Sequence, residues 1–242
     1  MSIADALIEA SRTLARATDG LAFGGEVTHV YNPLHYARDG WERYLHLGAG
    51  STKRIVLLGM NPGPWGMAQT GVPFGEITAV REWMGIEASI GSPTHPHPKR
   101  PIEGFACTRS EVSGRRLWGL MQARFGPVEA FFHEHFVANY CPLAFMAQSG
   151  RNITPDKLSP AERDPLFALC DEFLTQTIRL LEPDYVIGVG KFAESRIRTV
   201  LSSMPDDGIR SGVILHPSPA SPAANRDWAG TVTAQLEALD AW

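Results

Sequence analysis

Asn61, Asn139 and His216 each stand at the end of a short apolar run that reads as a strand. If these strands are parallel, their carboxyl ends meet at one edge of the sheet, where open α/β proteins bind their ligands. An amide both donates and accepts hydrogen bonds, so it can pair with an imide edge, –CO–NH–CO–, and an imidazole can donate to a carbonyl oxygen. The three side chains therefore indicate a site for a planar heterocycle.

The loops that carry these side chains are rigid. The segment Gly59-Met60-Asn61-Pro62-Gly63-Pro64 has glycine or proline at four of six positions, which fixes the backbone and leaves little side-chain bulk. His216-Pro217-Ser218-Pro219 is flanked by prolines in the same way. Phe74, between Pro73 and Gly75, has the apolar ring that could stack against a heterocycle.

Four apolar runs predict the strands that position these loops: Ile55–Leu58, Phe136–Tyr140, Tyr185–Val189 and Val213–Leu215. Helical spacing of apolar residues alternates with them, in Met1–Thr18, Pro165–Leu181, Lys191–Leu201 and Trp228–Leu239. Pro93–Pro101 has too many prolines for a helix or a central strand and is predicted to be a long loop. The alternation predicts an α/β fold, a three-layer α/β/α sandwich around a four-stranded parallel sheet, in one domain over residues 1–242.

Composition narrows the class of protein. No apolar stretch is long enough to span a bilayer, and the N-terminus has no signal-peptide pattern. Cys107, Cys141 and Cys170 are spaced too widely for a metal site and are too few for a disulfide framework, so a reducing compartment is expected. The histidine pairs in 95–97 and 133–135 lack a third ligand, and neither a metal nor another cofactor is expected. The net charge of −4 does not indicate a nucleic-acid binder, although basic residues gathered between positions 99 and 151 can form a local face for phosphates.

The motifs resemble those of the single-strand-selective monofunctional uracil-DNA glycosylases. The segments that carry the resemblance are Gly59–Pro64, Gly66–Glu76 and His216–Pro219, joined by Tyr31–Pro33, Lys99–Pro101, Ser110–Gly114, Asn139–Leu143, Ser149–Asn152 and Gly188–Gly190. The resemblance implies a DNA-repair enzyme that flips a base out of DNA, hydrolyses its N-glycosidic bond with water and leaves an abasic site.

The same resemblance implies roles for individual residues. Asn61 and His216 would be catalytic: Asn61 would hold the attacking water, and His216 would donate to O2 of the leaving uracil. Asn139 would pair with N3–H and O4 and reject cytosine, Phe74 would stack on the ring, and the backbone around Met60 would supply further donors.

Gly63 gives the most specific expectation. The glycosylases with a catalytic Asp have a bulky aromatic residue at the corresponding position, which blocks substituents at C5. Gly63 is expected to leave that space open, so that uracil with a polar C5 group, such as 5-hydroxymethyluracil, is also removed. Thymine would be rejected because its methyl group displaces a bound water without replacing the hydrogen bonds of that water.

DNA contacts are expected mainly from two loops. The loop after His216 would insert into the base stack, but Ala220 stands where vertebrate relatives commonly have arginine, which favours single-stranded or mispaired targets. Arg151 is expected to contact a phosphate. The remaining DNA-binding candidates are Ser110, Ser113, Pro217, Ser218 and Pro219.

Two other functions stay open at this point: a glycosylase whose main substrates are deaminated purines such as xanthine and hypoxanthine, and a non-catalytic reader of damaged or single-stranded DNA. The expected partner is uracil-containing DNA, single-stranded or double-stranded, with no membrane contact. A monomer in a bacterial cytoplasm, associated with the nucleoid, is expected, or a nuclear location if the source is eukaryotic.

Overall fold

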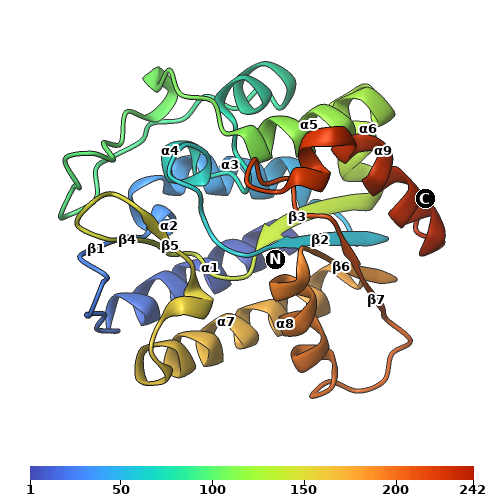
Figure 1. The fold of residues 1–242 in the computed structure, drawn as a ribbon. Helices are drawn as coiled ribbons and strands as arrows, with labels where there is room; N and C mark the ends of the chain where they lie inside the picture. The colour runs from blue at the N-terminus through green and yellow to red at the C-terminus, as the bar shows by residue number, and fades with distance from the viewer.

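The computed structural model describes residues 1–242 and contains the predicted parallel sheet (Figure 1). Its strand order is β3-β2-β6-β7, and all three neighbouring pairs are parallel. The strands are β2 (Ile55–Gly59), β3 (His135–Asn139), β6 (Tyr185–Val189) and β7 (Arg210–Ile214). The predicted sheet is confirmed: β6 has the predicted bounds, and the ends of the other strands differ by at most three residues.

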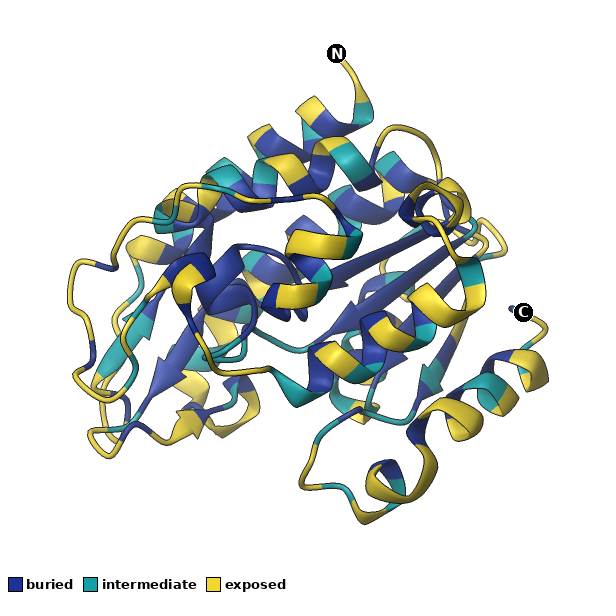
Figure 2. Ribbon diagram, turned by 90° about the horizontal axis from the view of Figure 1, so that it is seen from above, coloured by how far each residue is buried: buried dark blue, intermediate teal, exposed yellow.

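Helices cover both faces of this sheet (Figure 1). One layer contains α1 (Ile3–Asp19), α7 (Pro160–Leu181) and α8 (Lys191–Leu201); the other contains α3 (Arg38–Gly48), α5 (Val112–Phe125), α6 (Val128–Glu134) and α9 (Pro222–Ala238). Every residue of β2 and β6 is buried, which explains their uninterrupted apolar sequences (Figure 2). The predicted three-layer α/β/α arrangement is therefore confirmed.

Two helices begin earlier than the hydrophobic pattern predicted. Ser159 and Glu162 form a capping box that starts α7 at Pro160, and Pro165 is accommodated inside the helix. Ser221 caps α9 at Pro222, and the backbone of Asp227 has non-helical angles that kink this helix just before Trp228. In both cases a polar cap, rather than an apolar repeat, sets the first turn.

A second, smaller sheet was not predicted. It is antiparallel, with the order β1-β4-β5, and consists of β1 (His29–Tyr31), β4 (Ala144–Met146) and β5 (Asn152–Ile153). These strands have two or three residues each, too short for an alternating pattern to show. Pro93–Pro101 contains no helix or strand, as predicted.

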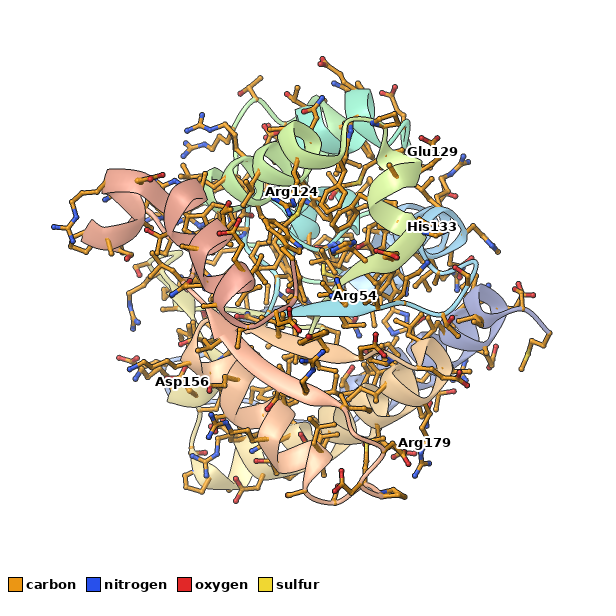
Figure 3. All side chains as sticks on the ribbon, turned by 90° about the vertical axis from the view of Figure 1, so that its right-hand side faces the viewer. Arg54, Arg124, Glu129, His133, Asp156 and Arg179 are labelled. Atoms are coloured by element: carbon orange, nitrogen blue, oxygen red, sulfur yellow. The ribbon has the colours of Figure 1, made fainter.

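The remaining short elements are α2 (Pro33–Tyr36), α4 (Met67–Thr70), the π-helical turn η1 (Ala79–Trp83), and the 3₁₀ turns η2 (Gly104–Ala106) and η3 (Pro155–Lys157). Arg54 and Arg124 lie on the side of the molecule where the strands begin (Figure 3). Arg54 donates to the Ala241 carbonyl, which fastens the C-terminus to this side. None of the helices combines the length and the apolar character needed to cross a membrane.

Candidate active site

The loops after β2, β3 and β7 meet at the carboxyl edge of the sheet. The pairing of β2 with β3 continues beyond the strands, because Tyr140 N–H donates to the Gly59 carbonyl (3.0 Å) and Cys141 N–H donates to the Met60 carbonyl (2.8 Å). A cavity of about 460 Å³ opens here. It is lined by Met60, Asn61, Pro62, Gly63, Pro64, Phe74, Glu111, Ser113, Asn139, Asn152, Thr154, His216, Ser218 and Pro219. Both predicted catalytic residues and all four predicted substrate-binding residues line one cavity.

The amide of Asn61 is oriented by a bond on its outer side. Its Nδ2 donates to the Leu143 carbonyl at 3.0 Å, just before β4, and a carbonyl can only accept. The Oδ1 atom is thereby left to accept from a water in the cavity. The unpredicted small sheet therefore contributes to the site, because β4 positions the carbonyl that orients Asn61.

A backbone hydrogen bond determines which ring nitrogen of His216 carries the proton. Its Nδ1 accepts from Ser218 N–H at 3.1 Å, so the neutral ring carries its proton on Nε2. Burial lowers the pKa of His216 below its usual value, which favours this neutral form. The ring also lies 6.4 Å from that of Phe74, between ring centroids. His216 thus offers an uncharged N–H donor beside an aromatic wall.

Asn139 and Phe74 pack against a glycine that must remain small. A Cβ on Gly59 would lie 2.6 Å from the Phe74 ring and would also collide with Oδ1 of Asn139. Nδ2 of Asn139 donates to the Met67 sulfur at 3.3 Å, a weak bond that leaves the other N–H and Oδ1 for a ligand. Phe74 has φ of +52°, a strained backbone conformation for an aromatic residue.

The α5 helix contributes to holding this strained turn. Gly114, in its first turn, allows close contact with the Phe74 carbonyl, and Trp118 Nε1 donates to the Pro73 carbonyl at 3.2 Å. The ring of Phe74 is thereby fixed at the cavity wall rather than free to turn away.

The expectation that Gly63 leaves an open space is wrong. A Cβ on Gly63 would lie 2.6 Å from Oε2 of Glu111, so the carboxyl group of Glu111 occupies the space that the missing side chain leaves. Burial, and then the neighbouring charge of Glu76, raise the pKa of Glu111 to about 7. The wall beside Gly63 is therefore polar and titratable, not empty.

The predicted DNA-binding residues divide into two groups. Ser113, Ser218 and Pro219 line the cavity, whereas Ser110, Arg151, Pro217 and Ala220 do not. Ser110 Oγ donates to Glu76 (3.1 Å), and the exposed Arg151 pairs with Glu26 (2.8 Å). Ser110 and Arg151 therefore have protein partners in the absence of DNA, and the DNA contacts of all these residues stay predictions.

Four residues of the site were given no role on the sequence. Glu111, Asn152 and Thr154 line the cavity, and Arg116 holds the His216 loop through bonds to the carbonyls of Pro217 (3.0 Å) and Ser218 (3.3 Å). Glu111 and Asn152 lie within segments that carry the family resemblance, so a signal existed for them. Nothing local in the sequence indicates that Arg116 reaches a loop about a hundred positions away.

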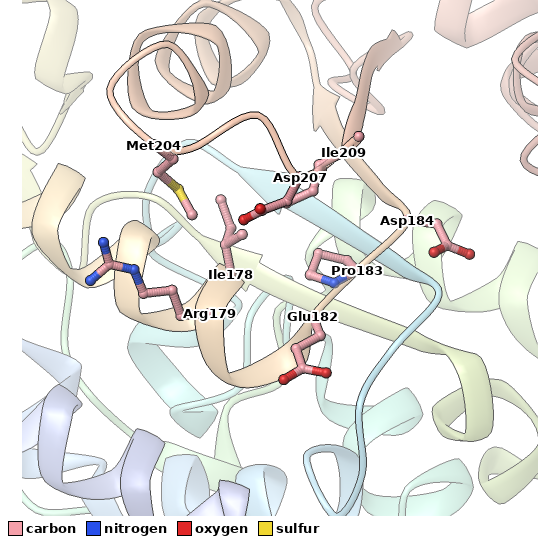
Figure 4. Close-up of a pocket in the computed structure, with 9 residues that line it drawn as sticks. Ile178, Arg179, Glu182, Pro183, Asp184, Met204, Asp207 and Ile209 are labelled. Atoms are coloured by element: carbon pink, nitrogen blue, oxygen red, sulfur yellow. The ribbon is translucent and has the colours of Figure 1, made fainter.

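Another cavity, of about 390 Å³, lies at the opposite edge of the sheet (Figure 4). It is formed by the end of α7 and the segments that enter β6 and β7. The carboxylates of Glu182, Asp184 and Asp207 point in different directions in this view and do not converge on one position. This cavity has no arrangement of polar groups comparable to that around Asn61.

Comparison with known proteins identifies the family and agrees with the fold. A family model described as the uracil DNA glycosylase superfamily matches residues 46–237. The chain belongs to this superfamily. Single-strand selective monofunctional uracil-DNA glycosylases from Rattus norvegicus and Bos taurus are each 43% identical to it over 98% of the chain, and the matches cover 85% and 87% of those proteins. Within the superfamily, the chain is a member of this single-strand selective monofunctional family.

A solved structure supports the fold independently. The crystal structure of wild-type SMUG2 from Pedobacter heparinus superposes with a TM-score of 0.65 and covers 99% of both chains at 21% identity.

Proposed function

We propose that this protein is a monofunctional uracil-DNA glycosylase of DNA repair, which hydrolyses the N-glycosidic bond of uracil in DNA and leaves an abasic site. The family supports the reaction, and the arrangement of Asn61, Asn139 and His216 around one cavity supports the assignment of their roles. The observation that carries those roles is the pair of outer bonds, to Leu143 and to Ser218, that leave an acceptor and a donor for the substrate.

Water attack at C1′ needs orientation more than deprotonation, because the glycosidic bond breaks through an oxocarbenium-like state. Oδ1 of Asn61 accepts a hydrogen bond from the water. This bond orients the water so that a lone pair on the water oxygen faces C1′. Nε2–H of His216 donates to O2 as negative charge develops on the leaving uracil. A neutral donor suits this role because it stabilises the anion without first protonating the base.

Base selection follows from the remaining walls. Asn139 accepts from N3–H and donates to O4, a pattern that uracil presents and cytosine does not. Phe74 stacks on the ring. Asn139 and Phe74 together select a flat base with an imide edge and reject bases that lack this edge.

We propose that the base reaches this cavity by flipping and that unpaired targets are favoured. A cavity formed at the edge of the sheet by the loops after β2, β3 and β7 takes a base only after that base leaves the stack. Ala220 is exposed and too small to fill the gap left in a duplex, so targets that cost less to unpair are preferred. Uracil with a polar group at C5 is included in the proposed substrate range. Residues 1–242 would act as one domain and as a monomer, and a bacterial cytoplasmic location stays a prediction.

A product assay tests the function. Purified protein is incubated with oligonucleotides that contain uracil, 5-hydroxymethyluracil, xanthine or hypoxanthine, each single-stranded and double-stranded, and both free base and alkali-labile sites are quantified. Release of uracil with an intact strand before alkali is expected. Faster release of either purine would favour the purine glycosylase, and binding without base release would favour the non-catalytic reader.

A further inference from the structure

Glu111 places a carboxyl group in the wall of the base cavity without the bonds that usually hold such a group. It is the residue that precedes α5, yet its side chain makes no capping bond to that helix. The carboxyl instead lies against Gly63 and Gly66, where a Cβ on either glycine would collide with it. Two glycines of the signature loop therefore make room for one acidic side chain.

One oxygen of this carboxyl group has no partner. Oε2 is buried and takes part in no hydrogen bond, although Glu111 lines the same cavity as Asn61 and His216. The neighbouring Glu76 differs, because its oxygens accept from Ser110 Oγ (3.1 Å) and Ala79 N–H (3.0 Å). An unpaired buried polar atom costs stability, so its retention in a ligand cavity points to a partner that arrives with the ligand.

The position of the carboxyl group identifies the edge of the base that it meets. With O2 at His216 and the N3–O4 edge at Asn139, C5 lies on the side of the ring opposite C2, away from His216. Gly63 is the residue expected beside C5, and the carboxyl of Glu111 occupies the space that a Cβ on Gly63 would take.

We propose that Glu111 is the residue that reads the C5 substituent, by a hydrogen bond to a polar group there or to the water that replaces it. The inference rests on the proposed function and adds a specificity residue to it. The hydroxyl of 5-hydroxymethyluracil gives Glu111 a partner, and unsubstituted uracil leaves room for a water that does so. The methyl group of thymine displaces that water and leaves the carboxyl unpaired. Thymine is thus rejected by an unsatisfied polar group rather than by lack of space.

Ionisation strengthens this discrimination. The carboxyl group changes charge near neutral pH, and a carboxylate accepts from a hydroxyl more strongly than a carboxylic acid does. An unpaired carboxylate beside a methyl group is also more costly than an unpaired acid. The preference for 5-hydroxymethyluracil over thymine is therefore expected to rise with pH. The groups that face Glu111 are the carboxylate of Glu76, which raises its pKa, and the uncharged backbone of the Gly63–Gly66 loop.

The test compares Glu111→Ala and Glu111→Gln with the unmodified protein. Single-turnover rates are measured on single-stranded oligonucleotides with uracil, 5-hydroxymethyluracil or thymine. In Glu111→Ala the rate ratio of 5-hydroxymethyluracil to thymine is expected to fall by about tenfold or more, the value of one hydrogen bond. Glu111→Gln, which still donates and accepts, is expected to keep the ratio within about threefold at pH 6. Glu129→Gln is the control, because it removes an exposed carboxyl group that neither lines the cavity nor contributes to the pKa of Glu111, and it is expected to keep the ratio.

An unchanged ratio in folded Glu111→Ala would overturn the proposal. If Glu111→Ala does not fold, the pH profile decides: between pH 6 and pH 8 the ratio should rise in the unmodified protein and stay flat in Glu111→Gln. A flat profile in both proteins would overturn the proposal as well. The proposed function fails separately, if the unmodified protein releases no uracil at all.

Discussion

At the scale of single residues, hydrogen bonds to the backbone outside the cavity determine which polar atoms the site offers to a ligand. Nδ2 of Asn61 donates to the Leu143 carbonyl, and Nδ1 of His216 accepts from Ser218 N–H. What remains inside is one acceptor for water and one neutral donor for the base. Sequence motifs predicted which residues gather here, but not these two bonds, because their partners come from the chain's own backbone and any residue type can supply them.

Asn61→Ala is expected to lower the single-turnover rate of uracil release by about a hundredfold or more, because the water loses its orienting acceptor. Affinity for uracil-containing DNA, measured by anisotropy, should change little. Asn152→Ala removes another amide from the same cavity and serves as the control, with a smaller expected loss. Equal losses in the two variants would contradict the role of Asn61.

His216 gives a prediction about pH. Because burial lowers its pKa, the neutral ring and its bond from Ser218 persist through neutral pH and are lost as pH falls through the lowered pKa. The rate of uracil release is therefore expected to fall on the acid side. His216→Gln, which keeps a neutral donor, should be slower, by about a hundredfold, and should lack that acid limb in its pH–rate profile. An acid limb that persists in His216→Gln would assign the titration to another group.

Glu111 gives a prediction about stability. Its pKa is raised, whereas that of His216 is lowered, so the effect of pH has the opposite direction. Its pKa in the folded protein is about 7, above the ordinary 4.5, so its contribution to stability is full below about pH 4.5 and is lost as pH rises through about 7. Glu111→Gln cannot ionise, so its free energy of unfolding relative to that of the unmodified protein should rise between pH 5 and pH 8, by up to about 3 kcal/mol. Urea unfolding at both pH values measures this, with the exposed Glu129→Gln as control. No gain at pH 8 would contradict the raised pKa.

At the scale of elements, α5 organises two sides of the cavity at once. Its first turn packs on the Phe74 segment, and Arg116 bonds to the loop that carries His216. The apolar runs of the sheet were predictable because strands buried on both faces leave continuous hydrophobic sequence. The tertiary role of α5 could not be predicted from the sequence. Arg116 has no local signal that distinguishes it from other surface arginines, and only the fold brings residues 217 and 218 to it.

Arg116→Ala is expected to reduce kcat/KM for uracil by about tenfold, because the loop loses its two hydrogen bonds from Arg116 and His216 is held less firmly. Arg115→Ala, at the neighbouring exposed position on α5, loses the same charge and is the matched control. Steady-state kinetics on single-stranded substrate measure both variants. Equal effects would indicate that the charge, and not the bonds to the loop, matters.

At the scale of the whole molecule, one hydrophobic core joins the helix layers to the parallel sheet, and it includes residues from α1 near the N-terminus and Ala241 near the C-terminus. The C-terminal end is held by Arg54 and by the Tyr185 hydroxyl, which donates to the Asp240 carbonyl at 2.6 Å. Since both ends of the chain pack into the same core as the cavity walls, we propose that residues 1–242 fold as one unit.

This continuity predicts cooperative unfolding. Tryptophan fluorescence, far-ultraviolet circular dichroism and residual uracil release should all be lost in one transition with a common midpoint in urea. Trp118 is a fully buried residue of α5, and Trp228 donates to the Leu215 carbonyl next to His216, so fluorescence reports on the surroundings of the site. Loss of activity well before the spectroscopic transition would show that the loops at the carboxyl edge open without the core. Two resolved spectroscopic transitions would divide the chain into separate domains.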